Sequence, residues 1–353
     1  MIAAHQPVQR PPDARLLVVD AGRHIGHAPR AAFVELLRPG DLVVANDAAT
    51  LPASLTGFHA ETGAAVEVRL AGLDSLRPEG VRRFKAVVFG AGDYRTRTED
   101  RPPPPALARG DRLILGPLRA TVEGWSGHPR LVVLCFDGAP DEVWAGLARH
   151  GRPIQYAHVP TPLALWDVWT RIAGPPVAFE PPSAGFALDW RALAAMRRRG
   201  VEFETVTHAA GVSSTGDEEL DRLLPFDEPY RIPAATALAV CRAKARGGRV
   251  VAVGTSVVRA LEHAAEAGGR VRVGEGVATQ RLGQSSRLRV VDAILSGTHE
   301  PGTSHYELLR AFLDDATLRR ATAALEARGY RTHEFGDSVL IERASEQAGR
   351  ERN

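Results

Sequence analysis

Short apolar runs alternate with a helical pattern at the beginning of the chain. Residues 16–20 and 42–46 are mainly apolar, which predicts two short buried strands. Between them, residues 30–37 carry apolar side chains at helical spacing, and the sequence Arg-Pro-Gly-Asp at 38–41 predicts a turn before the second strand. This order of elements indicates an α/β arrangement.

A different pattern begins near residue 52 and continues to about residue 137. Alternating apolar and polar positions at 65–70 predict a half-buried strand. Further short β-rich runs are 84–89, 112–115, 119–124 and 131–136. Several short strands at close spacing are typical of a small antiparallel barrel or sandwich. Residues 94–109 contain four consecutive prolines, which exclude regular structure and predict an exposed loop.

The α/β pattern returns after residue 138. The predicted helices span 141–150, 189–199, 233–246, 255–267 and, as a pair, 304–328. The predicted strands span 201–207, 249–254 and 338–342. Asp141 and Asp189 stand where an aspartate caps a helix, because its side chain can accept hydrogen bonds from free backbone N–H groups. The polar residues 344–353 predict a flexible tail.

The chain of 353 residues is long enough for two domains with cores of their own. The simplest arrangement is a discontinuous α/β main domain, residues 1–51 and 140–343, interrupted by an inserted β-barrel domain over residues 52–139. No internal repeat is visible in the sequence.

Charge and composition exclude several classes of protein. The chain carries 44 basic and 42 acidic residues, so its net charge of +2 excludes a strongly basic nucleic-acid-binding protein. Two cysteines without a C-x-x-C pair disfavour a disulfide framework or a cysteine zinc site. The sequence has no phosphate-binding P-loop motif and no long apolar window. We therefore expect a soluble, cytoplasmic monomer without a metal or resident cofactor.

The junction at residues 250–256 is the best local signal for a ligand site. A buried strand ends at Gly254, and Thr255 and Ser256 open the helix that follows. Free N–H groups and the helix dipole make such a terminus an anion site. The alternative is a helix cap without a ligand, because hydroxyl residues are preferred caps anyway. The stretch is not a G-x-G-x-x-G dinucleotide motif.

Two proline-bounded loops offer further candidates. The sequence Pro-Pro-Ser-Ala-Gly at 181–185 is rigid and lets a ligand approach its small residues closely, although it also fits a plain linker. The loop at 151–160 holds Gln155, Tyr156 and His158, which supply hydrogen-bonding groups and a stacking ring. A single histidine in such a loop is more often structural than catalytic.

Two histidines follow predicted strands, where ligands bind in open α/β sheets. His208 follows the strand at 201–207, and His299 follows an apolar run at 290–295 that contains Asp292. Histidine moves protons at neutral pH, so both are candidate acid–base groups. The spacing between His299 and His305 does not match the H-E-x-x-H zinc helix.

Five ordered blocks of the chain carry a resemblance to a known family. The blocks are 39–47 with 51–53, 182–185, 251–262, 289–295 with 299–301, and 335–341. Together they resemble the S-adenosylmethionine:tRNA ribosyltransferase-isomerase family of queuosine biosynthesis. The similarity is collinear from about residue 16 to residue 341.

The resemblance implies a fold and a reaction. The fold is an α/β open-barrel main domain with an inserted small antiparallel β-barrel domain. In the reaction, S-adenosylmethionine is a co-substrate that donates its ribosyl group. A 7-aminomethyl-7-deazaguanine base in tRNA attacks the sugar, adenine and methionine leave, and the ribose becomes an epoxycyclopentane. A base must remove the proton at C5′ of the donor, and an acid or hydrogen bond must assist the departure of adenine.

The resemblance also assigns roles to individual residues. The acid–base candidates are His208, His299 and Asp292. The candidates for binding S-adenosylmethionine are Ser183, Ala184, Gly185, Gly254, Thr255, Ser256 and Arg259. The candidates for binding the acceptor are Asn46, Gln155, Tyr156, His158, Glu228 and Tyr230.

The chain departs from the family pattern at several polar positions. Ala49 and Ser54 stand where the stretch N-N-T-R-V-I-P-A-R-L has arginine, and P-T-A-G-L-H-F loses its histidine at 182–188. Two alternatives therefore stay open. One is a paralogue that uses S-adenosylmethionine with a different, non-tRNA acceptor such as a small molecule, or cleaves it without an acceptor. The other is a non-catalytic RNA- or nucleoside-binding protein. Residues 82–112, with eight basic and four acidic side chains, are the candidate contact to a phosphate backbone.

Overall fold

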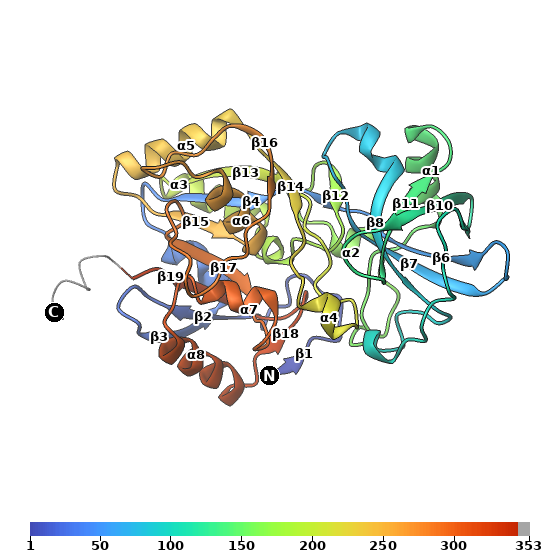
Figure 1. Cartoon of the computed structure of the whole chain (residues 1–353). Coiled ribbons are helices and arrows are strands. Elements are labelled where there is room, and N and C mark those ends of the chain that lie inside the picture. The colour runs from blue at the N-terminus through green and yellow to red at the C-terminus, as the bar shows by residue number, and fades with distance from the viewer. Residues whose placement is uncertain (345–353) are drawn as a thin grey trace.

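The computed structural model describes residues 1–344 and has two lobes (Figure 1). A lobe of mixed sheet and helices contains both the first and the last strands of the chain, and a β-barrel forms the other lobe. The predicted tail at 344–353 lies outside the described residues apart from residue 344. Among the described residues, no helix is both long and apolar enough to span a membrane.

The larger lobe is built on a nine-stranded sheet with the order β16-β14-β13-β4-β15-β17-β19-β2-β3. The strands are β2 (Arg15–Val19), β3 (Ile25–Pro29), β4 (Leu42–Asn46), β13 (Glu202–His208), β14 (Glu228–Ile232), β15 (Val250–Val253), β16 (Gly274–Ala278), β17 (Ala293–Gly297) and β19 (Ser338–Glu342). The four central strands β13, β4, β15 and β17 are parallel, and antiparallel pairs flank them on both sides.

Helices cover both faces of the central strands, which explains why β4, β15 and the start of β17 are continuous apolar runs. Leu42 and Val44 of β4 pack on one face with the helices α5 (Ala234–Ala245), α6 (Thr255–Ala264), α7 (Ser304–Leu309) and α8 (Asp315–Ala327). Val43 and Ala45 pack on the other face, with α3 (Trp190–Arg198) and the 3-10 helix η1 (Arg30–Leu36). Adjacent residues thus serve opposite cores, as the two-residue period of a strand requires.

Most of the predicted elements of this lobe are confirmed, with differences at their ends. Asp189 caps α3 by accepting a hydrogen bond from Ala192 N at 2.7 Å, as predicted. Asp141 does not cap its helix, because α1 (Pro140–His150) begins one residue earlier, and Glu142 accepts a hydrogen bond from Ala139 N at 2.8 Å instead. The predicted helix at 255–267 ends at Ala264.

The smaller lobe is a closed, six-stranded antiparallel barrel, not a sandwich. Its strands are β6 (Ser54–His59), β7 (Ala65–Gly72), β8 (Arg83–Phe89), β9 (Arg112–Leu115), β10 (Leu118–Trp125) and β11 (Leu131–Phe136). The sequence pattern missed β6, which contains a glycine. A Cβ atom at Gly57 would lie 1.9 Å from Ile114 O of β9, so only glycine lets these two strands approach.

The proline-rich loop at 94–109 is irregular except for the 3-10 helix η3 (Thr98–Asp100), and it is not exposed throughout. Its Arg101 is buried, because the guanidinium group pairs with the Glu67 carboxylate inside the barrel lobe and donates to Gly90 O at 3.1 Å. Glu67 also pairs with Arg69 at 2.9 Å. This buried charge network anchors the loop to the barrel.

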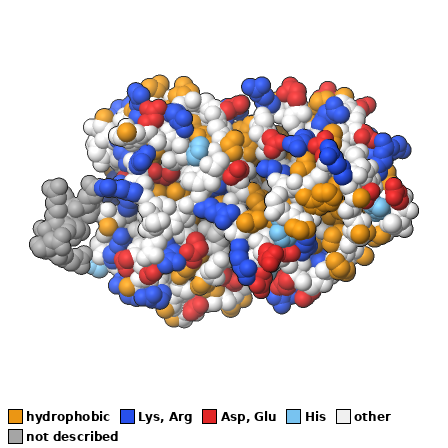
Figure 2. Space-filling model, in the orientation of Figure 1, with side chains coloured by type: hydrophobic (Ala, Val, Ile, Leu, Met, Phe, Trp, Pro, Cys, Tyr) orange, Lys and Arg blue, Asp and Glu red, His pale blue; other side chains and the backbone are white. Residues whose placement is uncertain are grey.

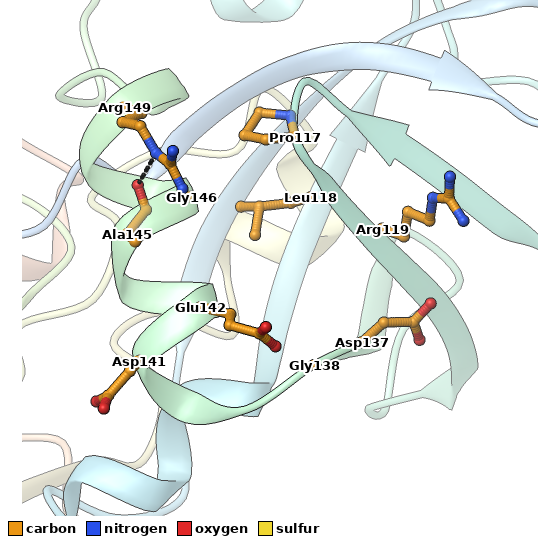
Figure 3. A pocket seen from close by; sticks show the side chains of 10 residues that line it. All are labelled: Pro117, Leu118, Arg119, Asp137, Gly138, Asp141, Glu142, Ala145, Gly146 and Arg149. Carbon is orange, nitrogen blue, oxygen red and sulfur yellow. Dashed lines mark hydrogen bonds between the residues drawn. The ribbon is translucent and has the colours of Figure 1, made fainter.

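Helix α1 packs on the outside of the barrel, beside a cavity of about 490 Å³ (Figure 3). A Cβ atom at Gly146 would lie 2.3 Å from Leu118 Cδ2, so the close approach of α1 to β10 requires a glycine. All six barrel strands lie within the predicted insertion at 52–139, while α1, which the predicted division assigns to the main domain, packs on the barrel. None of the predicted site residues lines this cavity.

The remaining elements are short. They are β1 (Ile2–Ala3), β5 (Ala49–Thr50), β12 (Pro176–Ala178), β18 (Arg331–Thr332), α2 (Leu165–Val168), α4 (Glu218–Asp221), η2 (Pro78–Arg82), η3 (Thr98–Asp100) and η4 (Ser183–Ala187). Two of them, η2 and η3, lie between strands of the barrel. β5 pairs with β12 in parallel, and β1 pairs with β18.

Candidate active site

The parallel strands bring several predicted site residues together at their carboxyl ends, which form one rim of the sheet. Asn46 ends β4, His208 ends β13, and Gly254 follows β15. The Asn46 side chain donates to His208 O at 2.9 Å and accepts from His208 N at 3.0 Å. It also lies 3.4 Å from Ser256 Oγ. The amide of Asn46 is therefore occupied by protein groups and joins two strands to the first turn of α6.

The two segments predicted to bind S-adenosylmethionine are neighbours. Gly254 has a φ of +95°, a conformation that favours glycine. A Cβ atom at Gly254 would lie 3.5 Å from the Cβ of Ala184, so η4 packs against the start of α6. Thr255 and Ser256 are partly exposed there. The structure thus places the glycine–hydroxyl junction and the Ser-Ala-Gly segment side by side.

Arg259 and Glu228 lie beneath this edge as a buried ion pair. The Arg259 guanidinium group also donates to Phe226 O at 3.0 Å and to Ala278 O at 2.9 Å. The Glu228 carboxylate accepts from Gly211 N at 2.6 Å. All of these partners are protein groups, so the ion pair stabilises the strand ends from the interior and does not line an open cavity.

His208 is fully buried next to that pair. Its Nε2 lies 3.5 Å from Glu228 Oε2, and its ring stacks on Tyr230 with centroids 6.5 Å apart. The Tyr230 hydroxyl is 2.9 Å from His263 Nδ1. Burial, together with the positive charge of Arg259, lowers the pKa of His208 well below its usual value. The imidazole is therefore neutral at pH 7.

A polar cavity of about 660 Å³ lies beyond the carboxyl ends of the strands. Its lining comes from six separate stretches of the chain: 97–99, 156–158, 180–183, 213–214, 297–305 and 332–334. Of the predicted site residues, Tyr156, His158, Ser183 and His299 line it. The sequence reasoning did not single out Glu180, His305, His333 and Glu334 as site residues, although they line the same space.

Two stacked histidines form one wall of this cavity. The rings of His299 and His305 lie 4.8 Å apart with an interplanar angle of 14°. The Nε2 atom of His299 is 2.9 Å from Ser296 Oγ. Burial, together with the charge of Arg259, lowers the pKa of His305 to about 4. Burial, with smaller effects of His305 and His333, lowers the pKa of His299 well below its usual value. Both rings are neutral at pH 7 and can donate or accept a hydrogen bond.

A buried tyrosine–carboxylate pair forms another part of the lining. The Tyr156 hydroxyl donates to the Glu180 carboxylate, and Ser213 N donates to Glu180 Oε1 at 3.0 Å. Burial, together with the neighbouring Glu334 carboxylate, raises the pKa of Glu180 to about 7. Burial and the Glu180 charge also hold the pKa of Tyr156 well above its usual value.

His158, His333 and Glu334 are the residues of this cavity that could hold a metal ion. One potential ligand atom from each lies within 4.8 Å of the others. However, His158 Nε2 is hydrogen-bonded to Glu334 at 3.1 Å, and the two histidine rings stack with centroids 4.1 Å apart. A metal ion binds in the plane of an imidazole at about 2 Å, and stacked rings do not share a plane. The expectation that no metal is needed stays a prediction.

Two predicted site residues lie away from this cavity. Asp292 precedes β17 and accepts from Val250 N, at the start of β15, at 2.8 Å. It pairs there with Lys244 and Arg343, at the amino ends of the parallel strands, whereas Gly254 lies at their carboxyl ends. The four residues of β15 separate these two ends of the strand by about 13 Å at the usual rise per residue.

The side chain of Gln155 folds back onto its own loop. Its amide donates to Val159 O and Thr161 O at 2.7 Å and accepts from Leu163 N at 2.9 Å. All three contacts are internal to the loop, so Gln155 fixes the conformation that presents Tyr156 and His158 to the cavity.

The fold and this site define an α/β protein with an inserted barrel and a histidine-rich polar cavity at the carboxyl edge of its parallel strands. The queuosine biosynthesis protein family matches residues 1–341, and the chain belongs to that family. It is 33% identical to an S-adenosylmethionine:tRNA ribosyltransferase-isomerase of Sorangium cellulosum, over 97% of this chain and 95% of the relative. It is 34% identical to the protein of the same name from Gloeobacter violaceus, over 96% and 92%.

The fold is also similar to that of a solved structure. The S-adenosylmethionine tRNA ribosyltransferase from Thermotoga maritima superposes with a TM-score of 0.50 at 23% identity, over 96% of each chain. The likeness extends over both lobes of this chain and concerns the fold.

Proposed function

We propose that the protein is an S-adenosylmethionine:tRNA ribosyltransferase-isomerase of queuosine biosynthesis. It transfers the ribosyl group of S-adenosylmethionine to a 7-aminomethyl-7-deazaguanine base in tRNA, isomerises it, and releases adenine and methionine. The observation that carries the proposal is the similarity to enzymes of this name over nearly the whole chain, both lobes included. The two alternatives, a small-molecule acceptor or no catalysis, have no comparable support.

The donor fits between the cavity and the start of α6. Ser183 lines the cavity, and the next residue, Ala184, packs against Gly254. A ligand held by the Ser-Ala-Gly segment therefore reaches the free N–H groups of the helix terminus, which favour a carboxylate such as that of S-adenosylmethionine. Arg259 supports this arrangement through its pair with Glu228 and does not touch the donor.

Of the three predicted acid–base residues, only His299 lines the cavity. Its neutral ring can hydrogen-bond the departing adenine or the sugar, and Ser296 orients it. The buried His208 supports the strand ends, and Asp292 holds the opposite edge of the sheet. We therefore assign the proton-handling chemistry to the cavity side chains.

The tRNA approaches from the side of the barrel lobe. Arg97, Thr98 and Glu99 of the basic segment 82–112 lie at the cavity. On the face shown in Figure 2, acidic and basic side chains are interspersed over both lobes. A local contact of this segment with phosphates is thus compatible with the small net charge of the chain.

The test is release of adenine from S-adenosylmethionine, measured by liquid chromatography and mass spectrometry. We expect release only when tRNA bearing the deazaguanine base is present, together with a mass increase of the modified nucleoside. The matched control is the same tRNA with guanine at that position. Release without any tRNA would favour the paralogue, and salt-dependent tRNA binding without release would favour the non-catalytic protein.

A further inference from the structure

Glu180 differs from every other buried acidic side chain in the described part of the chain. These side chains are Asp41, Glu67, Glu180, Glu228, Asp337 and Glu342. Five of them pair with arginine: Asp41 and Glu342 with Arg249, Glu67 with Arg69, Glu228 with Arg259, and Asp337 with Arg15. Within residues 1–344, Glu180 has no lysine, arginine or histidine partner.

The partners that Glu180 does have are neutral hydrogen-bond donors. The Tyr156 hydroxyl and Ser213 N both contact Oε1, and the Ser213 hydroxyl also acts on the carboxylate. The carboxylate lines the cavity together with Glu334, whose negative charge acts on it. A buried carboxylate near a second one is unfavourable unless a cation compensates the charge. This corner of the cavity is therefore suited to a cationic ligand.

Three cationic groups enter the site in the proposed reaction, on which this inference rests: the sulfonium and the α-ammonium of S-adenosylmethionine, and the aminomethyl ammonium of the acceptor. The sulfonium of S-adenosylmethionine carries no hydrogen that it could donate. The aminomethyl group of the acceptor is an ammonium at neutral pH, because the pKa of an alkylamine is about 10, and it has three N–H donors. The corner offers acceptors in the Glu180 carboxylate and in Ser214 O, which lies 3.2 Å from the Tyr156 hydroxyl. Hydrogen-bond acceptors select an ammonium over the sulfonium. The α-ammonium of the donor is bonded to the same carbon as its carboxylate, which the proposed function places at the start of α6, so the aminomethyl ammonium is the group left for this corner.

We propose that Glu180 binds the aminomethyl ammonium of the acceptor base and removes one of its protons, so that the free amine can attack the ribosyl group. In this step an N–H bond breaks and an O–H bond forms on the carboxylate, with no change at carbon. Burial favours the transfer, because a neutral acid and a neutral amine need less solvation than two opposite charges. The acid then loses its proton to water after the product leaves.

Tyr156 is a positioning residue in this arrangement. Its hydroxyl holds the carboxylate in place, and its hydrogen bond lowers the pKa of Glu180 against the larger effect of burial. Loss of this hydroxyl should raise the pKa of Glu180 further and leave the carboxylate in the cavity. Tyr156→Phe thus changes the titration of the base without removing it.

The experiment compares the wild type with Glu180→Gln, Tyr156→Phe and the control Glu35→Gln, which removes an exposed carboxylate outside the cavity. S-adenosylmethionine binding is measured by calorimetry, and adenine release with base-bearing tRNA is measured from pH 5.5 to pH 9.5. We expect Glu180→Gln to bind S-adenosylmethionine within about twofold of wild type. Its kcat/KM for the tRNA should fall at least about 100-fold at pH 7.

The pH profile distinguishes loss of a base from structural damage. The Glu180→Gln rate should rise about tenfold per pH unit up to pH 9, since more acceptor is then free amine, while the wild-type rate levels off above about pH 7. For Tyr156→Phe, the rise of the adenine-release rate on the acidic side of the pH profile (its acidic limb) should move to higher pH. If Glu180→Gln does not fold, as seen from its thermal melting, the shift of the Tyr156→Phe limb tests the inference instead.

Three results would overturn the inference with an active wild type. They are an unchanged kcat/KM for Glu180→Gln, a loss of rate that does not depend on pH, and an unshifted limb for Tyr156→Phe. A wild type that releases no adenine with base-bearing tRNA contradicts the proposed function itself. The two failures are therefore separate observations.

Discussion

The side chain of Asn46 exchanges two hydrogen bonds with the main chain of His208, at 2.9 and 3.0 Å. The two residues are the last of β4 and β13, so the amide closes the pair of strands where the regular ladder ends. Its carbonyl also accepts from Ala48 N at 3.0 Å, which turns the chain away from the sheet. One buried amide thus sets the geometry of the edge on which the candidate active site is built.

This relationship predicts a stability effect of Asn46→Ala. The substitution leaves buried backbone groups of His208 without partners, and each such group costs about 1–3 kcal/mol. We expect the free energy of unfolding to fall by about 2–4 kcal/mol, measured by urea denaturation. The exposed amide Gln6→Ala serves as the control and should change it by less than about 0.5 kcal/mol. Equal stability of Asn46→Ala and wild type would contradict the bridging role.

The Arg259–Glu228 pair predicts a coupled effect on stability. Arg259→Ala leaves the Glu228 carboxylate buried and unpaired, so we expect a loss of about 3–5 kcal/mol in unfolding free energy. The double variant Arg259→Ala with Glu228→Gln should recover part of that loss, because the lone charge is removed. Additive effects in this double-mutant cycle would show that the two side chains are not coupled.

The raised pKa of Glu180 predicts a pH dependence of stability. The carboxyl group has a pKa of about 7 when folded and 4.5 when not, so the folded state binds more protons between these values. The contribution of Glu180 to the free energy of unfolding is therefore greatest below pH 4.5 and is lost as the pH rises through 7. The stability of the wild type relative to Glu180→Gln should therefore fall by about 3 kcal/mol across this range. Urea denaturation at a series of pH values measures it, and a constant difference would contradict the assignment.

Gly254 predicts a specific effect on donor binding. An alanine there is strained by about 1–3 kcal/mol at the positive φ, and its Cβ meets Ala184 of the neighbouring segment. We expect Gly254→Ala to weaken S-adenosylmethionine binding at least about tenfold in calorimetry. Gly247 has a φ of +71° in open space, so Gly247→Ala tests backbone strain alone. Equal binding by the two variants would place the donor elsewhere.

The stacked arrangement of His158 and His333 predicts independence from metal ions. Treatment with a chelator followed by gel filtration should leave adenine release unchanged, because no planar approach to both rings exists for one ion. Metal content by mass spectrometry should be well below one equivalent. Stoichiometric zinc, with activity lost on its removal and restored by zinc alone, would assign the cluster with Glu334 as a metal site.

The sequence by itself determined the local elements of this protein. Continuous apolar runs identified β4 and β15 because strands of a covered parallel sheet are buried on both faces. The predicted strand at 338–342 is β19, and Asp189 caps α3. The ordered motif blocks identified the family, which the comparison over residues 1–341 confirms. Each of these features depends on neighbouring residues or on linear order.

Only the tertiary structure decided which side chains meet. Tyr156 and Glu180 lie in different loops, and Glu334 joins them from more than 150 positions away, so no local period could connect them. The same holds for Asp292, which precedes β17, and Gly254, which follows β15: both adjoin apolar runs, but they lie at opposite ends of the parallel strands. Strand direction and pairing set these positions, and both depend on long-range hydrogen bonds. The arginine pairing of all buried acids except Glu180 within residues 1–344 is likewise a property of the folded core.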